Sequence, residues 1–157
     1  VRRVLFNGQS VTLKDGRVIH PEDVLGPSRP GLSVAITGDA GQVEALVDEV
    51  AGADVLVCEA TYLQRDEAMA RRFGHLTAAE AAWLGREAGV RTLVLNHLSQ
   101  RYRVRDILAE AEMTFPSTIV ARDFDRLTVT REKITLVNQQ LEDDEVLLDD
   151  NGDQVAL

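Results

Sequence analysis

Several residue types are scarce in this chain, and each scarcity excludes a class of protein. Its 157 residues contain one cysteine, Cys58, which cannot form an internal disulfide or complete a zinc finger, so a reducing compartment is expected. Because Cys58 lies in an apolar run, we expect it to be a buried small hydrophobe. No apolar run reaches the roughly 18 residues of a membrane span, and no signal-peptide pattern opens the sequence. We therefore expect a cytoplasmic chain without a membrane segment.

Basic residues are also scarce: 17 Lys and Arg face 26 Asp and Glu, for a formal net charge of −9. This balance argues against a free-standing nucleic-acid binder. No Lys or Arg follows Lys133, whereas seven acids do: Glu142, Asp143, Asp144, Glu145, Asp149, Asp150 and Asp153. We expect one domain over residues 1–133 and an acidic C-terminal extension over 134–157. The extension is either a hairpin around Asn151-Gly152 or disordered.

The apolar pattern alternates between strands and helices. Strands are expected at residues 32–37, 55–57, 92–95, 118–121 and 126–130, and helices at 42–50, 66–72, 78–88 and 105–114. Thr77 and Glu80 form a capping-box pattern at the start of the third helix, and Gly89 is placed to end it. Before this series, an Asp15-Gly16 turn predicts a β-hairpin, and residues 21–30 indicate an extended connector. The alternation predicts an α/β fold with helices packed on a sheet.

Charged or metal-binding side chains follow the strand-like runs. Asp39, Glu59 and His97 stand at or just after three expected strand ends, and His75 precedes a helix. Ligands gather at the carboxyl ends of strands in open α/β sheets, so one edge could collect all four. Carboxylate and imidazole suit a hydrolytic zinc or manganese centre. Taken alone, however, Asp39 is favoured as a helix N-cap, and His97 as a core or loop histidine.

Four short segments resemble those of a known family. They read Gly38-Asp39-Ala40, Cys58-Glu59-Ala60-Thr61, His75-Leu76-Thr77 and Asn96-His97-Leu98-Ser99-Gln100-Arg101-Tyr102. In order, they resemble the Gly-Asp-Thr, His-Glu-Ala-Thr, His-Ser-Thr and Thr-His-x-Ser-x-Arg-Tyr segments of ribonuclease Z. That family comprises tRNA 3′-processing endonucleases of the metallo-β-lactamase superfamily. The resemblance runs from Phe6 to about Thr130 and covers the C-terminal half of the family's domain.

The resemblance implies a fold, a reaction and roles for individual residues. The fold would be the C-terminal half of a metallo-β-lactamase-type αββα sandwich. The reaction would be metal-dependent cleavage of the 3′ trailer from precursor tRNA by a homodimeric enzyme. Two Zn²⁺ ions, with Mn²⁺ as an alternative, would be held in the complete site. The implied roles are metal binding by Asp39 and His97, catalysis by Glu59 and His75, and substrate binding by Arg101 and Tyr102.

The chain also departs from the family pattern. Ala40, Cys58 and Leu76 replace a threonine, a histidine and a serine. The superfamily signature His-x-His-x-Asp-His does not occur, because the three histidines stand at positions 20, 75 and 97. We therefore expect the isolated chain to be incomplete and inactive, with the missing N-terminal half in the same gene product or a separate chain. The alternatives are a non-catalytic half-domain that binds a protein partner, or another metallo-β-lactamase-fold hydrolase.

Overall fold

The computed structural model describes residues 1–27 and 31–138, and the chain divides into two compact units, Val1–Gly31 and Leu32–Leu157. The N-terminal unit contains α1 (Arg2–Phe6), β1 (Val11–Thr12), β2 (Val18–Ile19) and α2 (Pro21–Val24). β1 and β2 pair antiparallel around the Asp15-Gly16 turn, where Gly16 has a φ of +86°. The predicted hairpin is therefore confirmed.

The start of the predicted connector is wrong, because residues 21–24 form the helical turn α2. Proline is favourable at the first position of a helix, where its missing N–H costs nothing. The Asp23 carboxylate accepts a hydrogen bond of 2.8 Å from the backbone N–H of His20, which satisfies a donor at the helix start. His20, which precedes Pro21 and matches none of the four family segments, is exposed. Residues 28–30 of the connector lie outside the described residues.

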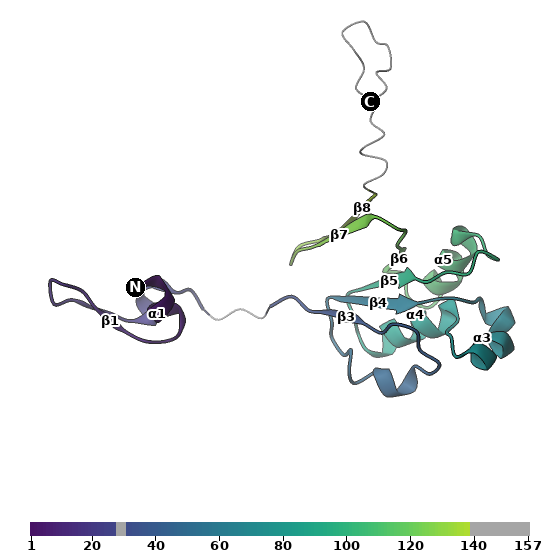
Figure 1. Ribbon diagram of the computed structural model, residues 1–157, viewed down its shortest axis with the longest axis horizontal. Coiled ribbons are helices and arrows are strands. Elements are labelled where there is room, and N and C mark those ends of the chain that lie inside the picture. Colours follow the sequence, from purple (N-terminus) through teal and green to yellow (C-terminus); the bar gives the residue numbers. More distant parts are fainter. Residues whose placement is uncertain (28–30, 139–157) are drawn as a thin grey trace, which may run out of the picture. The chain divides into compact units, whose positions relative to one another are not determined.

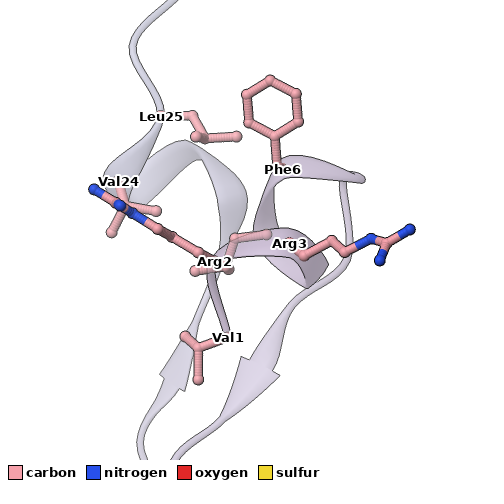
Figure 2. A pocket seen from close by; sticks show the side chains of 7 residues that line it. Val1, Arg2, Arg3, Phe6, Val24 and Leu25 are labelled. Atoms are coloured by element: carbon pink, nitrogen blue, oxygen red, sulfur yellow. The ribbon is translucent and has the colours of Figure 1, made fainter.

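A pocket of about 680 Å³ lies within the N-terminal unit (Figure 2). Side chains of α1 and of the end of α2 surround it: Val1, Arg2, Arg3, Leu5, Phe6, Val24 and Leu25. Among residues 1–27 Leu5 alone is buried. The unit therefore has almost no apolar core, and most of its large apolar side chains face outward.

The second unit is built on a four-stranded parallel sheet (Figure 1). Its strands are β3 (Val34–Ile36), β4 (Val55–Glu59), β5 (Thr92–Asn96) and β6 (Thr118–Val120), in the spatial order β3-β4-β5-β6. Each strand lies beside its predecessor in the chain, so every connection crosses over through helical segments. The α/β fold predicted from the alternating pattern is confirmed.

The helical segments of this unit are η1 (Glu44–Leu46), η2 (Gln64–Asp66), α3 (Glu67–Phe73), α4 (Ala78–Glu87) and α5 (Val104–Glu112). The core lies where α4 and α5 pack on one face of the sheet (Figure 1). Leu56, Cys58, Leu93 and Leu95 come from the strands, and Ala78, Ala81, Ala82, Leu84, Ile107 and Ala111 from the helices. The small alanine side chains allow α4 to approach the sheet closely.

The capping box of α4 is confirmed. Thr77 accepts a hydrogen bond from the Glu80 N–H at 3.2 Å, and Glu80 accepts one from the Thr77 N–H at 2.8 Å. The preceding helix, α3, is capped by Gly74 with a left-handed φ of +72°, and Gly89 with a φ of +62° follows α4. These two signals confine His75 to the short turn between α3 and α4.

Two details of the sequence interpretation are wrong. The helix expected at 42–50 is the three-residue η1 followed by turns, although Val43 and Val50 are buried as their spacing predicts. This segment is rich in valine, which favours helices less than unbranched residues do. The amphipathic helical patterns around Phe73, Trp83 and Phe115 predict core positions, but Phe73 is 58% exposed at the C-terminal end of α3, where the Arg72 guanidinium lies 5.5 Å from its ring centroid. Trp83 and Phe115 do pack against the core.

A β-hairpin follows the parallel sheet. β7 (Asp125–Val129) pairs antiparallel with β8 (Ile134–Asn138). Arg91 donates hydrogen bonds to the carbonyls of Thr130 and Arg131 and forms an ion pair with Asp54 at 3.5 Å. The expected boundary after residue 133 falls between these paired strands, and as a domain limit it stays a prediction. Both readings of the acidic run concern residues outside the described part.

No helix in residues 1–27 or 31–138 combines the length and apolar character needed to cross a bilayer.

Candidate functional site

The carboxyl ends of β3, β4 and β5 bring the predicted site residues together. Asp39 follows β3, Glu59 is the last residue of β4, and His97 directly follows β5. One ligand atom each from Asp39, His75 and His97 lie within 4.8 Å of one another. Glu59 contacts His75 directly. The four side chains therefore lie together at one edge of the sheet, as predicted.

Glu59 is the buried centre of this group, with only 1% of the residue exposed. One carboxylate oxygen accepts a hydrogen bond of 2.8 Å from the Ala40 N–H. The other accepts one of 2.5 Å from the Thr61 hydroxyl. The Nδ1 atom of His75 lies 3.0 Å and 3.1 Å from the two oxygens. Because an ionised carboxylate only accepts, all three neighbours are oriented as donors toward it.

His75 is held by this carboxylate through one ring nitrogen. Its Nδ1 faces Glu59, so Nε2 is left for a ligand outside the protein core. The ring lies beside that of His97, with 5.1 Å between the centroids, and beside that of Tyr62 at 6.1 Å. A fixed ring with one free nitrogen suits either proton transfer or metal coordination.

His97 has an unusual backbone conformation. Its φ of +52° lies in the left-handed region, which residues with a side chain seldom adopt. Its Nδ1 lies 2.9 Å from the Thr61 hydroxyl and 3.6 Å from an Asp39 carboxylate oxygen. The side chain is 50% exposed. Such backbone strain persists where surrounding contacts hold it and is concentrated at functional sites.

Asp39 is the most exposed member of the group. It follows Gly38, whose φ is +63°. The N-cap reading is not supported, because η1 begins at residue 44, its N-cap is Val43, and within residues 31–138 no side-chain hydrogen bond caps it. The carboxylate is instead turned toward His97. Its oxygens are therefore available to a ligand at the sheet edge.

Arg101 and Tyr102 differ in what they offer a substrate. The Tyr102 hydroxyl donates a 2.6 Å hydrogen bond to Asp66, and the Arg65 guanidinium lies 5.5 Å from its ring centroid. Burial, followed by this bond to Asp66, raises the pKa of Tyr102 above 10.0. Tyr102 thus ties the loop after β5 to η2. Arg101 is exposed, with Nη1 3.0 Å from the Met69 sulfur.

Thr61 is a site residue that the sequence interpretation missed. Its hydroxyl lies within 3.5 Å of atoms of Glu59, His75 and His97. The signal was present, because Thr61 belongs to the Cys58-Glu59-Ala60-Thr61 segment. A threonine just beyond a buried strand has many structural explanations, however, and only the folded chain shows these contacts.

Cys58 takes no part in the site. It is buried in the core, and burial raises the pKa of its thiol to about 11. The expectation of a buried small hydrophobe is confirmed.

The donor set fits a metal ion. Asp39, His75 and His97 offer one carboxylate and two imidazoles, the combination found in one class of catalytic zinc sites. Metal-bound histidines hold their second ring nitrogen in a hydrogen bond. Both histidines here do so, His75 with Glu59 and His97 with Thr61. The chemistry of these residues therefore suits Zn²⁺ better than an oxygen-preferring ion such as Mg²⁺.

Comparison with known proteins identifies close relatives. No protein-family model matches the sequence. Over 129 residues the chain is 55% identical to ribonuclease Z of Bradyrhizobium sp. strain ORS 278, a match covering 82% of this chain and 43% of that protein. Ribonuclease Z of Brevibacillus brevis is 43% identical over 136 residues, with the same two coverages. The chain spans less than half the length of these curated relatives.

A solved structure supports the fold. The metallo-β-lactamase fold protein YhfI from Bacillus subtilis superimposes with a TM-score of 0.52 and 26% sequence identity. The match covers 57% of this chain and 36% of that one. The described sheet and helices therefore correspond to part of a metallo-β-lactamase-type fold.

Proposed function

Because this chain belongs to the ribonuclease Z family, we propose that it forms part of a metal-dependent endoribonuclease that removes the 3′ trailer from precursor tRNA. The observation that carries the proposal is the cluster of Asp39, His75 and His97 at the sheet edge, with Glu59 buried behind it. The relatives are about twice as long as the matched region. The complete site is therefore proposed to need a further half, in the same gene product or in a separate chain.

Asp39 and His97 are the proposed metal-binding residues, with two Zn²⁺ ions in the complete site and Mn²⁺ as an alternative. Bound metal ions would stabilise negative charge on the oxygens of a phosphodiester. The exposed Asp39 carboxylate and the half-exposed His97 imidazole are both accessible from the sheet edge. Within residues 1–27 and 31–138 this cluster offers three donors, so we propose weak metal binding and no cleavage by the isolated chain.

Glu59 and His75 form the proposed acid pair. A protonated His75 would donate its Nδ1–H to Glu59 and keep Nε2–H for the leaving 3′ oxygen. The buried carboxylate faces three donors, which holds the ring in a single orientation. A positioned acid of this kind contributes roughly 10²–10⁴-fold to a rate.

The exposed Arg101 is the proposed phosphate contact, because a guanidinium binds two phosphate oxygens at once. Tyr102 would act with it, mainly by fixing the loop after β5 through Asp66. Precursor tRNA is the proposed substrate. A homodimer in the cytoplasm is the proposed assembly and location.

The cluster keeps its described contacts despite the three departures from the family pattern, which favours the catalytic proposal over a non-catalytic half-domain. Cys58 and Leu76 are buried in the apolar core, and Ala40 contributes its backbone N–H to Glu59. With these three replacements, His75 still contacts Glu59 at 3.0 Å and His97 lies 3.6 Å from Asp39. The cluster is thus intact despite the altered segments.

The test is a chimera in which the N-terminal part of the Bradyrhizobium ribonuclease Z precedes this chain. Metal content and single-turnover cleavage of a precursor tRNA are measured for His75→Ala, His97→Ala and the exposed control His20→Ala. We expect His97→Ala to lose metal, His75→Ala to keep metal and cleave about 10²–10⁴-fold more slowly, and His20→Ala to behave as the parent. An unchanged rate for His75→Ala would remove it from the mechanism. Loss of metal in that variant would make it a ligand instead. A chimera that binds no metal and cleaves no RNA would refute the function.

A further inference from the structure

Thr61 is a side chain of the site to which the proposed reaction gives no role. Thr61 is 8% exposed, and its hydroxyl lies between the Glu59–His75 pair and His97. We propose that Thr61 is a positioning residue, which extends the hydrogen bonding of Glu59 to His97 and fixes that imidazole as the Nδ1–H tautomer. The expected effect of Thr61 on metal affinity rests on the proposed function, whereas the tautomer of His97 does not.

The direction of each hydrogen bond follows from the chemistry of the groups. The 2.5 Å contact between Thr61 and Glu59 requires a proton between the two oxygens, and the carboxylate has none to give. Thr61 is therefore the donor. A hydroxyl has a single hydrogen, so toward His97 Nδ1 at 2.9 Å it can only accept. The proton of that contact must then reside on Nδ1 of His97.

Two competing arrangements are weaker. Thr61 also lies 3.0 Å from the His97 carbonyl, but donating there would leave two oxygen lone pairs facing each other at 2.5 Å across the Glu59 contact. Asp39 also approaches His97 Nδ1, but at 3.6 Å it is beyond hydrogen-bond distance. Thr61 is accordingly the partner that decides the tautomer.

The same logic applies to His75, whose Nδ1 faces Glu59 directly. One buried carboxylate thus orders both imidazoles, the first by contact and the second through the Thr61 hydroxyl. In each neutral ring the lone pair is then on Nε2, the nitrogen not held by these contacts. Removing such a supporting hydrogen bond typically lowers metal affinity about 10–100-fold.

Position 61 offers a matched set of substitutions. Thr61→Val keeps the shape but removes the hydroxyl, so Glu59 loses a donor and His97 loses its acceptor. Thr61→Ser keeps the hydroxyl. Thr92→Val is the control, because Thr92 is a buried threonine of β5 whose hydroxyl contacts Ser117 at 3.4 Å instead of a site residue.

The experiment is a long-range ¹H–¹⁵N correlation spectrum of the histidine rings in the metal-free, ¹⁵N-labelled chain, with His97 assigned by comparison with His97→Asn. We expect the Nδ1–H pattern for His97 in the parent, Thr61→Ser and Thr92→Val, and its loss in Thr61→Val. An Nε2–H pattern in the parent, or an unchanged pattern in Thr61→Val, would overturn the proposal. Should Thr61→Val fail to fold, the parent and Thr61→Ser spectra still decide it.

A zinc titration of the same proteins gives a second readout, with affinity expected to fall about 10–100-fold in Thr61→Val only. Equal zinc affinity in the parent and Thr61→Val would overturn the supporting role. The expected tautomer together with no zinc binding by any chimera would instead refute the proposed function and leave the role of Thr61 in ordering His97 intact.

Discussion

Replacing Glu59 by glutamine isolates what the buried carboxylate contributes to the fold. The two side chains have nearly the same shape, so no cavity arises. The amide, however, carries one oxygen and one NH₂ group, whereas the site presents donors from Ala40, Thr61 and His75. If the amide oxygen accepts from the Ala40 N–H, the NH₂ group faces the Thr61 hydroxyl, donor against donor. Glu59→Gln must therefore leave one donor unpaired or force Thr61 to turn.

The loss of stability expected for Glu59→Gln follows from the burial of this side chain. A buried donor without a partner costs about 1–3 kcal/mol. Because Glu59 is 1% exposed, water cannot readily replace the lost partner. Thr61 could relieve part of the conflict by donating to the His97 carbonyl, so the lower half of that interval is expected. This is a sizeable part of the roughly 5–15 kcal/mol that stabilises a typical domain.

Urea unfolding measures this loss, with the fluorescence of the chain's single tryptophan as the signal. Trp83 lies on α4 and packs against the core, so it reports on the unit that contains Glu59. Glu87→Gln is the control, because Glu87 is an exposed residue of α4 and its replacement should change stability by less than about 0.5 kcal/mol. If Glu59→Gln were as stable as Glu87→Gln, the carboxylate would not be organising its neighbours and the reasoning would fail.

Three further predictions concern residues outside the cluster. With its pKa raised to about 11 by burial, Cys58 should resist iodoacetamide at pH 8 in the native chain and react after denaturation; equal rates would contradict its burial. Tyr102, whose raised pKa favours the neutral phenol in the folded state, should titrate above pH 10 by absorbance at 295 nm, and Asp66→Asn should lower that midpoint. The raised pKa of Tyr102 contributes to the stability of the folded chain below the pKa that this tyrosine has when unfolded. That contribution is lost as pH rises through the pKa of the folded state. Thr77→Ala should destabilise the chain by about 1 kcal/mol through loss of the α4 cap, as measured by urea unfolding, and Thr77→Ser should not.

The sequence predicts the parts of this fold whose signals are local. β4 and β5 are continuous apolar runs buried on both faces, and α4 carries its capping box, so all three are found within one or two residues. The convergence of Asp39, Glu59, His75 and His97 was predictable because parallel strands end at the same edge. The prediction of a helix at residues 42–50 is wrong because apolar spacing alone does not outweigh the low helix propensity of valine.

Other features depend on contacts between distant segments. The Tyr102–Asp66 bond joins residues 36 positions apart, and no local pattern indicates it. The strand β8 is recognised only from its pairing with β7 in the folded chain, because in the sequence residues 134–138 adjoin a strongly acidic run. The role of Thr61 likewise needs the folded positions of Glu59 and His97. The acceptor to which a hydroxyl donates depends on distances that differ by a few tenths of an ångström.

The left-handed backbone of His97 sets stability against the metal binding proposed for this position. A non-glycine residue in this conformation costs about 1–2 kcal/mol, and asparagine tolerates it better than most. His97→Asn should therefore be at least as stable as the parent chain, whereas a β-branched residue such as valine should be clearly less stable. Selection for thermal resistance alone would drift away from histidine at this position. A thermostable descendant obtained without an activity screen would then be a well-folded protein that has lost the imidazole proposed to bind metal.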